Sequence, residues 1–359
     1  MFNSIYKSKK IIITGNTGFK GSWLTSWLLE LGADIYGISN DVPTEPSMFN
    51  ELDLISKIKY YNQDIRDLKS IKKIINEIKP DFLFHLAAQP LVSKSYDDPV
   101  ETISTNVQGT ANILDSLRLS NHRCTAIIIT SDKCYDNVEW PWGYKETDTL
   151  GGKDIYSGSK GAAELVIKSF YHSFFKSEKS NIRIASARAG NVIGGGDWAT
   201  DRIIPDCINA WQQRDAAILR NPNATRPWQH VLEPLSGYLT LGEKLYENNR
   251  FNGETFNFGP PSDQSHTVLD LVKEIINYWP GEKWIDKSSN NSNIHEAQLL
   301  KLNCDKAFLN LNWQSILDFK TTSQWTGEWY KTYYDQGPKA VIELTREQIQ
   351  NYMKYKKLD

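Results

Sequence analysis

Three features of the sequence predict an α/β protein with a doubly wound parallel sheet and a smaller lobe toward the C-terminus. Short β-branched, apolar runs alternate with segments whose apolar residues recur at helical spacing. A glycine-rich loop joins the first run to the first helical segment. After about Arg188 the composition changes, and Gly, Pro, Asn and Trp become dense. Strands that alternate with amphipathic helices form a parallel sheet covered on both faces, the Rossmann type of fold.

The individual elements follow from the same patterns. A buried strand is expected at 10–14, where Ile11, Ile12 and Ile13 follow Lys10 and the run breaks at Gly15. The next helix carries apolar residues at helical spacing and ends at Gly32. Further strands are expected at 34–38, 81–86 and 126–129, with a helix over 71–78 closed by Pro80 and a charged helical segment over 339–359.

The change in composition predicts two domains with a boundary near residue 188. Residues 1–188 would form the sheet domain. Residues 189–359 would mainly form the smaller lobe, with some segments returning to the first domain. Glycine- and tryptophan-rich stretches at 194–198 and 221–228 predict long loops in this lobe, and loops of that kind commonly carry function.

The composition excludes several classes of protein. Because 41 Lys and Arg residues face 43 Asp and Glu residues, no strong overall attraction to nucleic acid or to an anionic membrane is expected. No apolar run approaches the roughly 20 residues of a membrane-spanning helix, and no secretory signal is visible. The four cysteines and six histidines show no metal-ligand spacing. We therefore expect a cytoplasmic protein with free thiols and no metal site.

The glycine loop Gly15-Asn16-Thr17-Gly18-Phe19-Lys20-Gly21 lies between the first strand and the first helix. Glycines let the backbone approach a pyrophosphate, and the N-terminus of a helix attracts its negative charge. The loop therefore predicts dinucleotide binding, and the alternative is a glycine-rich turn without a ligand. The expected contacts are Gly15, Thr17, Gly18, Phe19 and Gly21.

An acidic residue beyond the second strand indicates which dinucleotide binds. The carboxylate of Asp41 can accept hydrogen bonds from the adenosine ribose and would repel a 2′-phosphate, which favours NAD over NADP. The alternative for Asp41 is an exposed loop acid. Asp64 and Ile65, at the end of the third strand, could reach the adenine, whereas Asp67 is interpreted as a helix cap.

Tyr156 and Lys160 are four residues apart, so on a helix they share one face. A cation beside a phenol stabilises the phenolate and lowers its pKa. Such a tyrosine can take the proton of a sugar hydroxyl while hydride leaves the same carbon.

With these motifs the chain resembles the extended short-chain dehydrogenase/reductase family. The family-typical pieces are the glycine loop, His85-Leu86-Ala87-Ala88-Gln89, Asn106-Val107-Gln108-Gly109-Thr110, and Tyr156 with Lys160. The resemblance implies an NAD-binding first domain to which Ala87, Ala88, Gln89, Asn106, Tyr156 and Lys160 contribute.

More closely, the chain resembles the CDP-glucose 4,6-dehydratases from about Lys10 to about Tyr330. The specific pieces are the glycine loop with Ser22-Trp23, Thr130-Ser131-Asp132-Lys133-Cys134-Tyr135, Arg188-Ala189-Gly190-Asn191-Val192-Ile193-Gly194-Gly195-Gly196-Asp197-Trp198, and Arg226-Pro227-Trp228-Gln229-His230-Val231. The implied reaction is oxidation at C4 of CDP-glucose, loss of water across C5 and C6, and return of hydride to C6. The implied setting is bacterial deoxysugar and O-antigen biosynthesis.

The resemblance also implies the catalytic residues. Ser131 would hydrogen-bond the C4 oxygen, and Asp132 would be the acid at O6. The related dTDP-glucose dehydratases have Thr-Asp-Glu here, with the Glu as base, so Lys133 leaves the C5 base open. Lys133 would take the proton only if neutral; otherwise it would stabilise the enolate or form an ion pair that orients Asp132.

The nucleotide-sugar end is expected in the smaller lobe. Asn191, Arg202 and Arg226 are implied as substrate contacts, with His230 beside them, because the planar guanidinium suits phosphate. The alternative for each arginine is a surface salt bridge. Nothing in the residues distinguishes cytosine from uracil.

Other functions share part of this pattern, and one of them is a 4,6-dehydratase that acts on another nucleotide sugar. A nucleotide-sugar epimerase would need the same dinucleotide and tyrosine but no acid at O6. A regulatory protein that senses the dinucleotide would commonly lack the tyrosine or the lysine, and both are present. The family resemblance further implies a homo-oligomer, a dimer or tetramer, through a helical face of the first domain.

Overall fold

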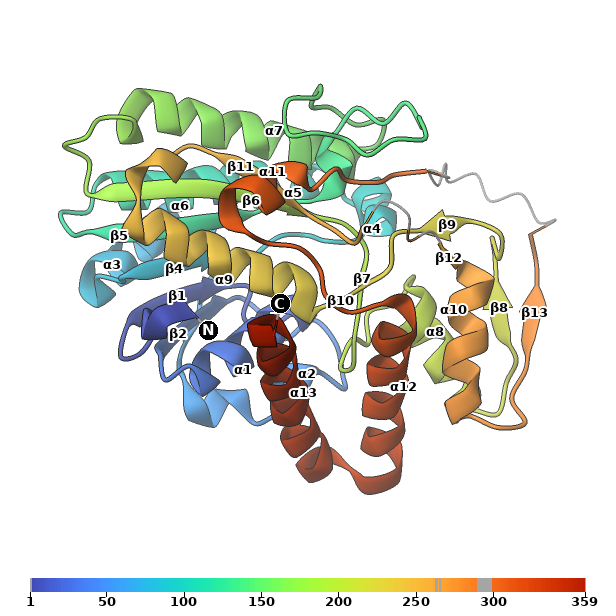
Figure 1. The fold of residues 1–359 in the computed structure, drawn as a ribbon. Helices are drawn as coiled ribbons and strands as arrows, with labels where there is room; N and C mark the ends of the chain where they lie inside the picture. The colour runs from blue at the N-terminus through green and yellow to red at the C-terminus, as the bar shows by residue number, and fades with distance from the viewer. Residues whose placement is uncertain (1, 262–263, 265, 289–298, 359) are drawn as a thin grey trace.

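In a computed structural model, which describes residues 2–261, 264, 266–288 and 299–358, the chain is built on a seven-stranded parallel sheet (Figure 1). The strands lie in the order β11-β6-β5-β4-β1-β2-β3. Their bounds are β1 Lys10–Thr14, β2 Asp34–Ser39, β3 Lys59–Asn62, β4 Phe82–His85, β5 Cys124–Ile129, β6 Ile182–Ala189 and β11 Thr255–Phe258. The predicted fold class is confirmed, and the strand order reverses between β1 and β4, where ligands of such sheets bind.

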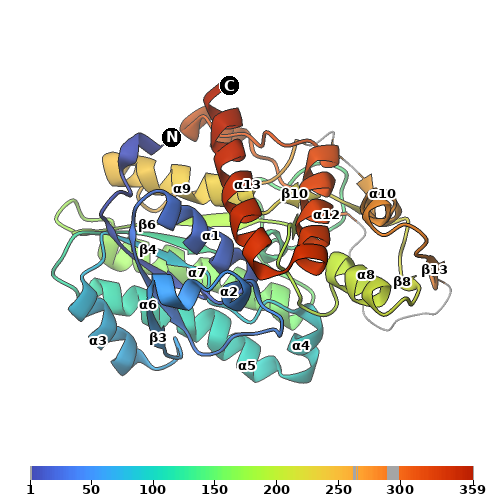
Figure 2. The same ribbon diagram turned by 90° about the horizontal axis from the view of Figure 1, so that it is seen from below.

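Helices cover both faces of the sheet (Figures 1 and 2). The first face is packed by α3 (Leu68–Ile78), α6 (Gly109–Arg118) and α7 (Ile155–Phe170), and the second by α1 (Phe19–Glu30) and α9 (Leu232–Glu247). In α3 the four isoleucines at helical spacing are all buried, and each burial stabilises the fold by about 1.5–3 kcal/mol. The side chain of Asp67 accepts a hydrogen bond from the Ser70 amide, which confirms Asp67 as the cap of this helix.

The smaller lobe lies at one side of the sheet (Figure 1). It contains α8 (Ile203–Gln212), α10 (Val268–Ile275), the β8–β13 pair (Ala217–Leu219 with Trp284–Asp286) and the β9–β12 pair (Thr225–Arg226 with His266–Thr267). The β7–β10 pair (Val192–Ile193 with Gln229–His230), α11 (Asp305–Leu311) and the helices α12 (Phe319–Gln336) and α13 (Pro338–Leu358) complete this half. β11 and α9 come from the same half of the chain but belong to the central sheet and its cover.

Shorter helices fill the connections of the first half. They are α2 (Met48–Glu51), α4 (Val92–Asp97) and α5 (Pro99–Ile103), with the helical turns η3 (Ser104–Gln108), η4 (Asp132–Cys134) and η5 (Tyr171–Phe175). None of the helices in the described part of the chain is both long and apolar enough to cross a membrane.

The register of three neighbouring strands brings three loops to one edge of the sheet. Thr14 at the end of β1 pairs with His85 at the end of β4, and His85 pairs with Ile128 of β5. The hydroxyl of Thr14 and Nδ1 of His85 are 2.7 Å apart, so these strand ends are also joined by side chains. The loops that follow β1, β4 and β5 therefore open side by side, and they carry most of the predicted site residues.

Candidate active site

The glycine loop has the shape that a pyrophosphate requires. Gly15 has φ of +72°, and a Cβ there would lie 2.7 Å from the backbone nitrogen of Ala87. A Cβ at Gly21 would lie 2.0 Å from the carbonyl oxygen of Gly15, so only glycine lets the loop fold back on α1. Gly18 begins α1 without a side-chain cap, which leaves the first N–H groups available to an anion. The loop thus fits a dinucleotide.

Two of the residues predicted for the adenosine half lie in different surroundings. The hydroxyl of Thr17 donates to the carbonyl oxygen of Asp41 at 2.7 Å, which holds Asp41 against the glycine loop with its side chain exposed. Asp64 instead forms an ion pair of 2.6 Å with Arg66, and this hydrogen-bonded guanidinium lowers the pKa of the carboxyl. Ile65 is buried against Gly109. Their roles toward adenine stay predictions.

The loop after β4 is tied to the helix that carries the tyrosine. The amide nitrogen of Gln89 donates to Oδ1 of Asn106 at 2.8 Å, and Nδ2 of Asn106 donates to the Ser159 hydroxyl at 2.9 Å. Ala87 donates to Thr14 at 3.2 Å, and the neighbouring Ala88 is half-buried. The side-chain amide of Asn106 is thus hydrogen-bonded to Gln89 and Ser159. These bonds position α7 relative to the loop after β4.

Tyr156 and Lys160 lie on one face of α7, with the lysine Nζ 5.9 Å from the centre of the phenol ring. Burial raises the pKa of Tyr156 to about 12, against the lowering effect of a hydrogen bond with Ser131. Burial also lowers the pKa of Lys160 to about 8. Desolvation is the largest influence on the phenol, so the net pKa of Tyr156 is raised; the lowering effect expected of Lys160 stays a prediction.

Ser131 and Asp132 stand beside this pair at the end of β5. The Ser131 hydroxyl donates to Oδ1 of Asp132 at 2.9 Å, and the amide of Lys133 donates to the same hydroxyl at 3.2 Å. Asp132 is 4% exposed and faces Gly190, where a Cβ would lie 2.6 Å from Oδ2. In the described structure Lys133 is half-buried and makes no ion pair with Asp132, so the orienting pair left open by the sequence is not formed.

Of the predicted substrate residues, Arg202 faces the site. It forms an ion pair of 2.6 Å with Asp197, and its charge also acts on Tyr156. Asn191 is half-buried between β6 and β7, and Arg226 lies half-buried on β9. No His, Cys, Asp and Glu cluster suited to a metal occurs among the residues that the structure describes.

His230 requires a correction. It is fully buried, with its ring edge-on to Trp23 and Trp325 at 5.7 and 5.6 Å, and burial lowers its pKa to about 3. Its Nδ1 accepts a hydrogen bond from the Leu232 amide. A ring enclosed in this way packs α1 against α12 and is not placed to contact a substrate directly.

The sequence reasoning assigned no role to a buried ion pair behind the catalytic helix. Glu164 of α7 and Arg188 of β6 are 2.8 Å apart, and each side chain is 3% exposed. Burial alone would raise the pKa of Glu164, but the Arg188 charge and hydrogen bonds outweigh it and hold this pKa below its usual value. Glu164 also accepts hydrogen bonds from Thr130 and Ser186, so it joins α7 to the end of β5 and to the interior of β6.

We expect Glu164→Gln to lower the free energy of unfolding by about 3 kcal/mol, because Arg188 is left buried and unpaired. Urea denaturation followed by circular dichroism measures this change. The matched control is Glu77→Gln, which removes an exposed ion pair with Lys73 whose side chains are 54% and 76% exposed. If both substitutions lowered the free energy of unfolding by the same amount, the stabilising role of the buried Glu164–Arg188 pair would be contradicted.

Together these groups define a class of protein. A loop shaped for pyrophosphate faces a buried tyrosine and lysine across the point where the strand order reverses, as in a dinucleotide-dependent short-chain dehydrogenase/reductase.

The chain belongs to the GDP-mannose 4,6 dehydratase family, whose model matches residues 12–325. It is 44% identical to a CDP-glucose 4,6-dehydratase of Salmonella typhimurium, over 98% of each chain. A CDP-paratose 2-epimerase of Salmonella typhi is 27% identical over 75% of this chain and 84% of its own.

Solved structures share the fold. The epimerase Mth375 of Methanothermobacter thermautotrophicus superposes with a TM-score of 0.79 at 21% identity, over 96% of each chain. A dTDP-glucose 4,6-dehydratase of Bacillus anthracis in complex with NAD gives 0.74 at 19% identity, over 92% of this chain and 98% of that one.

Proposed function

We propose that the chain is an NAD-dependent CDP-glucose 4,6-dehydratase, which converts CDP-D-glucose to CDP-4-keto-6-deoxy-D-glucose and water. The observation that carries the proposal is the 44% identity over 98% of each chain with the Salmonella enzyme of that name. The buried Asp132 beside Ser131 and Tyr156 supports it, because an epimerase would have no use for an acid at O6.

The glycine loop would hold the dinucleotide pyrophosphate, and Asp41 the adenosine ribose. When bound, NAD would accept a hydride from C4 and return it to C6. As a phenolate, Tyr156 would take the O4 proton at its phenol oxygen, and the Lys160 ammonium would stabilise that phenolate before the transfer. Ser131 would hold the C4 oxygen by a hydrogen bond. The ketone at C4 then acidifies the C5 proton, since the carbanion delocalises as an enolate.

Elimination requires an acid that protonates O6 as the C6–O6 bond breaks. Asp132 would supply this proton, and its burial against Gly190 keeps water away from one side of the carboxyl. Asn191, Arg202 and Arg226 would contact the sugar and the diphosphate of the substrate, since guanidinium groups pair well with phosphate.

The test is to offer the purified protein CDP-, UDP-, dTDP- and GDP-glucose with NAD and to follow the products by mass spectrometry. We expect loss of water from CDP-glucose at the highest rate. An isomer of unchanged mass would indicate an epimerase instead. Absence of any product, with NAD still bound, would indicate a sensor.

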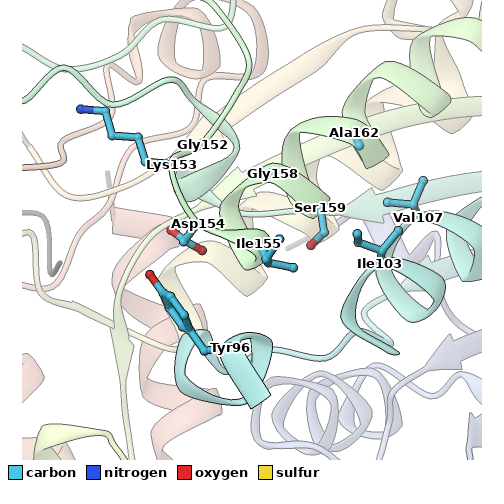
Figure 3. Close-up of a pocket in the computed structure, with 10 residues that line it drawn as sticks. All are labelled: Tyr96, Ile103, Val107, Gly152, Lys153, Asp154, Ile155, Gly158, Ser159 and Ala162. Carbon is cyan, nitrogen blue, oxygen red and sulfur yellow. The ribbon is translucent and has the colours of Figure 1, made fainter. Parts of the chain in front are cut away.

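The proposal includes a homo-oligomer formed through α5 and α7. Exposed apolar side chains gather on these neighbouring helices: Val100 is 75%, Ile103 47% and Leu165 54% exposed. Beside them, a hollow of about 450 Å³ opens between α4–η3 and the start of α7 (Figure 3). A second copy of the chain would cover these apolar side chains.

We expect Leu165→Glu to convert the wild-type oligomer to monomers, because a buried carboxylate would have no partner there. Size-exclusion chromatography with light scattering measures the mass. The control is Leu309→Glu, at a position on α11 that is 77% exposed. A wild-type protein that is already monomeric, or a Leu165→Glu protein of unchanged mass, would contradict this interface.

We also propose that the protein acts in the cytoplasm, in the synthesis of a bacterial deoxysugar such as those of O-antigens. The thiols of Cys124, Cys134, Cys207 and Cys304 support this, since all four are free and three of them are buried. Fractionation of the producing cells, with the protein followed by an antibody, would test the location.

A further inference from the structure

The turn that carries the proposed acid has a buried polar side chain at each of its ends. The turn η4 (Asp132–Cys134) begins after Ser131, where β5 has ended. Thr130 precedes these residues and Tyr135 follows them, and both are buried. Their hydroxyl groups need partners inside the protein, because a buried hydroxyl without a hydrogen bond is costly.

Both hydroxyl groups find a partner in the Glu164–Arg188 pair. The Thr130 hydroxyl donates a hydrogen bond to Oε1 of Glu164, and Nη1 of Arg188 donates to the phenol oxygen of Tyr135 at 2.7 Å. Nη2 of Arg188 donates to Oε2 of Glu164 at 2.8 Å, which closes the path from one end of the turn to the other. The Tyr135 hydroxyl donates in turn to Oδ1 of Asn257 on β11 at 2.8 Å. We call the four side chains of this path the clamp: Thr130, Glu164, Arg188 and Tyr135.

The clamp is anchored on the helix that carries the tyrosine and the lysine. On α7, Glu164 follows Lys160 by four residues and Tyr156 by eight, so the three side chains lie on successive turns of one side of the helix. A Cβ at Gly161 would lie 3.2 Å from the carbonyl oxygen of Cys134, so the helix and the turn are in direct contact there. The clamp therefore joins the turn to the side of α7 that presents Tyr156.

The proposed chemistry depends on how this turn lies relative to α7. Tyr156 would act at O4 of the sugar and Asp132 at O6, so both must meet one substrate in one arrangement. The Ser131 hydroxyl donates to Asp132 at 2.9 Å, so a shift of the turn would move these two residues together. Groups that act together must be held within about 0.5 Å of the productive geometry. A displacement of about 1 Å can lower a rate about 100-fold.

We propose that the clamp holds Ser131 and Asp132 in place relative to Tyr156, an inference that rests on the proposed dehydratase function. The members of the clamp are positioning residues: they act on the elimination through Asp132 and take no proton from the substrate. Because the side chains of Glu164 and Arg188 are each 3% exposed, water does not compete for the hydrogen bonds that link the turn to the helix.

The experiment measures the rate of water loss from CDP-glucose, with NAD in excess, for Thr130→Val and Tyr135→Phe. Each substitution removes one hydroxyl from one end of the turn and leaves the charges of Glu164 and Arg188 in place, so a loss of charge cannot explain its effect. We expect each to lower kcat about 10- to 100-fold and to keep KM within about twofold, because the groups proposed to bind the diphosphate are unchanged. Thr130→Ser keeps the hydroxyl and should stay within about threefold of the wild-type kcat.

A double substitution shows whether the clamp acts through Asp132. In the Asp132→Asn protein, Thr130→Val should lower the remaining rate by less than about threefold, because the acid that it positions is already absent. A general defect in folding would instead multiply with the effect of Asp132→Asn. The matched control is Thr326→Val, which removes a fully buried hydroxyl that is bonded to the Thr322 carbonyl oxygen of α12 at 2.8 Å. It should dehydrate CDP-glucose at the wild-type rate.

Wild-type kcat in Thr130→Val, or equal losses in Thr130→Val and Thr130→Ser, would overturn the positioning role. So would a loss caused by Thr130→Val that is as large in the Asp132→Asn protein as in the wild type. If Thr130→Val does not fold, Tyr135→Phe decides in the same way, in the same pair of backgrounds. A wild type that binds NAD but dehydrates none of the four nucleotide sugars would overturn the dehydratase function itself, and with it the role of the clamp.

Discussion

Tyr156→Phe is expected to bind NAD as the wild type does but to form almost no 4-keto product, with turnover lower by a factor of about 10²–10⁴. In the proposed mechanism the phenol oxygen takes the O4 proton, and phenylalanine removes that oxygen while keeping the buried ring. Fluorescence titration measures NAD binding, and mass spectrometry measures the product.

The control for this substitution is Tyr355→Phe, since Tyr355 is 47% exposed near the end of α13. It should change neither binding nor turnover. Near wild-type turnover of Tyr156→Phe would rule out the tyrosine as the proton acceptor. Loss of NAD binding together with turnover would instead assign the tyrosine to cofactor binding.

Asp132→Asn is expected to oxidise C4 and then stop before water is lost, lowering the rate of dehydration by about 10²–10³. The amide oxygen can still accept the hydrogen bond that the Ser131 hydroxyl donates, at 2.9 Å in the wild type, but the amide has no proton to give to O6. Reduced dinucleotide should therefore accumulate with a 4-keto sugar that has not lost water, and absorbance and mass spectrometry detect the two.

Asp335→Asn is the matched control, because it removes a carboxylate that is 50% exposed on α12 and paired with Lys331 on the surface. It should dehydrate CDP-glucose as the wild type does. Unchanged dehydration by Asp132→Asn would remove Asp132 as the acid, and a failure to oxidise C4 would show that Asp132 acts before the elimination.

Several parts of this fold could be predicted because they depend on local patterns. The isoleucines of 71–78 repeat at the helical period, so they form one buried face wherever the helix packs. The apolar run at 10–14 forms a buried strand. The glycines that follow it are needed because a Cβ at Gly15 or Gly21 would collide with the backbone. The four-residue separation of Tyr156 and Lys160 places them on one helical face without any knowledge of the rest of the chain.

Other parts depend on which distant segments meet. The motif around His230 predicted a substrate contact, but residues of α1 and α12 enclose its ring. No pattern in the sequence near residue 230 indicates this burial. The buried pair of Glu164 and Arg188 is likewise formed by residues 24 positions apart, which only the packing of α7 on β6 brings together.

The class of fold, the dinucleotide loop and the residue types of the chemistry could be predicted from local patterns, because periodicity, turn sterics and helical spacing act over a few residues. Burial and electrostatic surroundings depend on the packing of distant segments, as the raised pKa of Tyr156 and the buried pair of Glu164 with Arg188 illustrate. Desolvation and Coulomb interactions depend on every neighbouring atom in space, and most of those atoms belong to residues far along the chain.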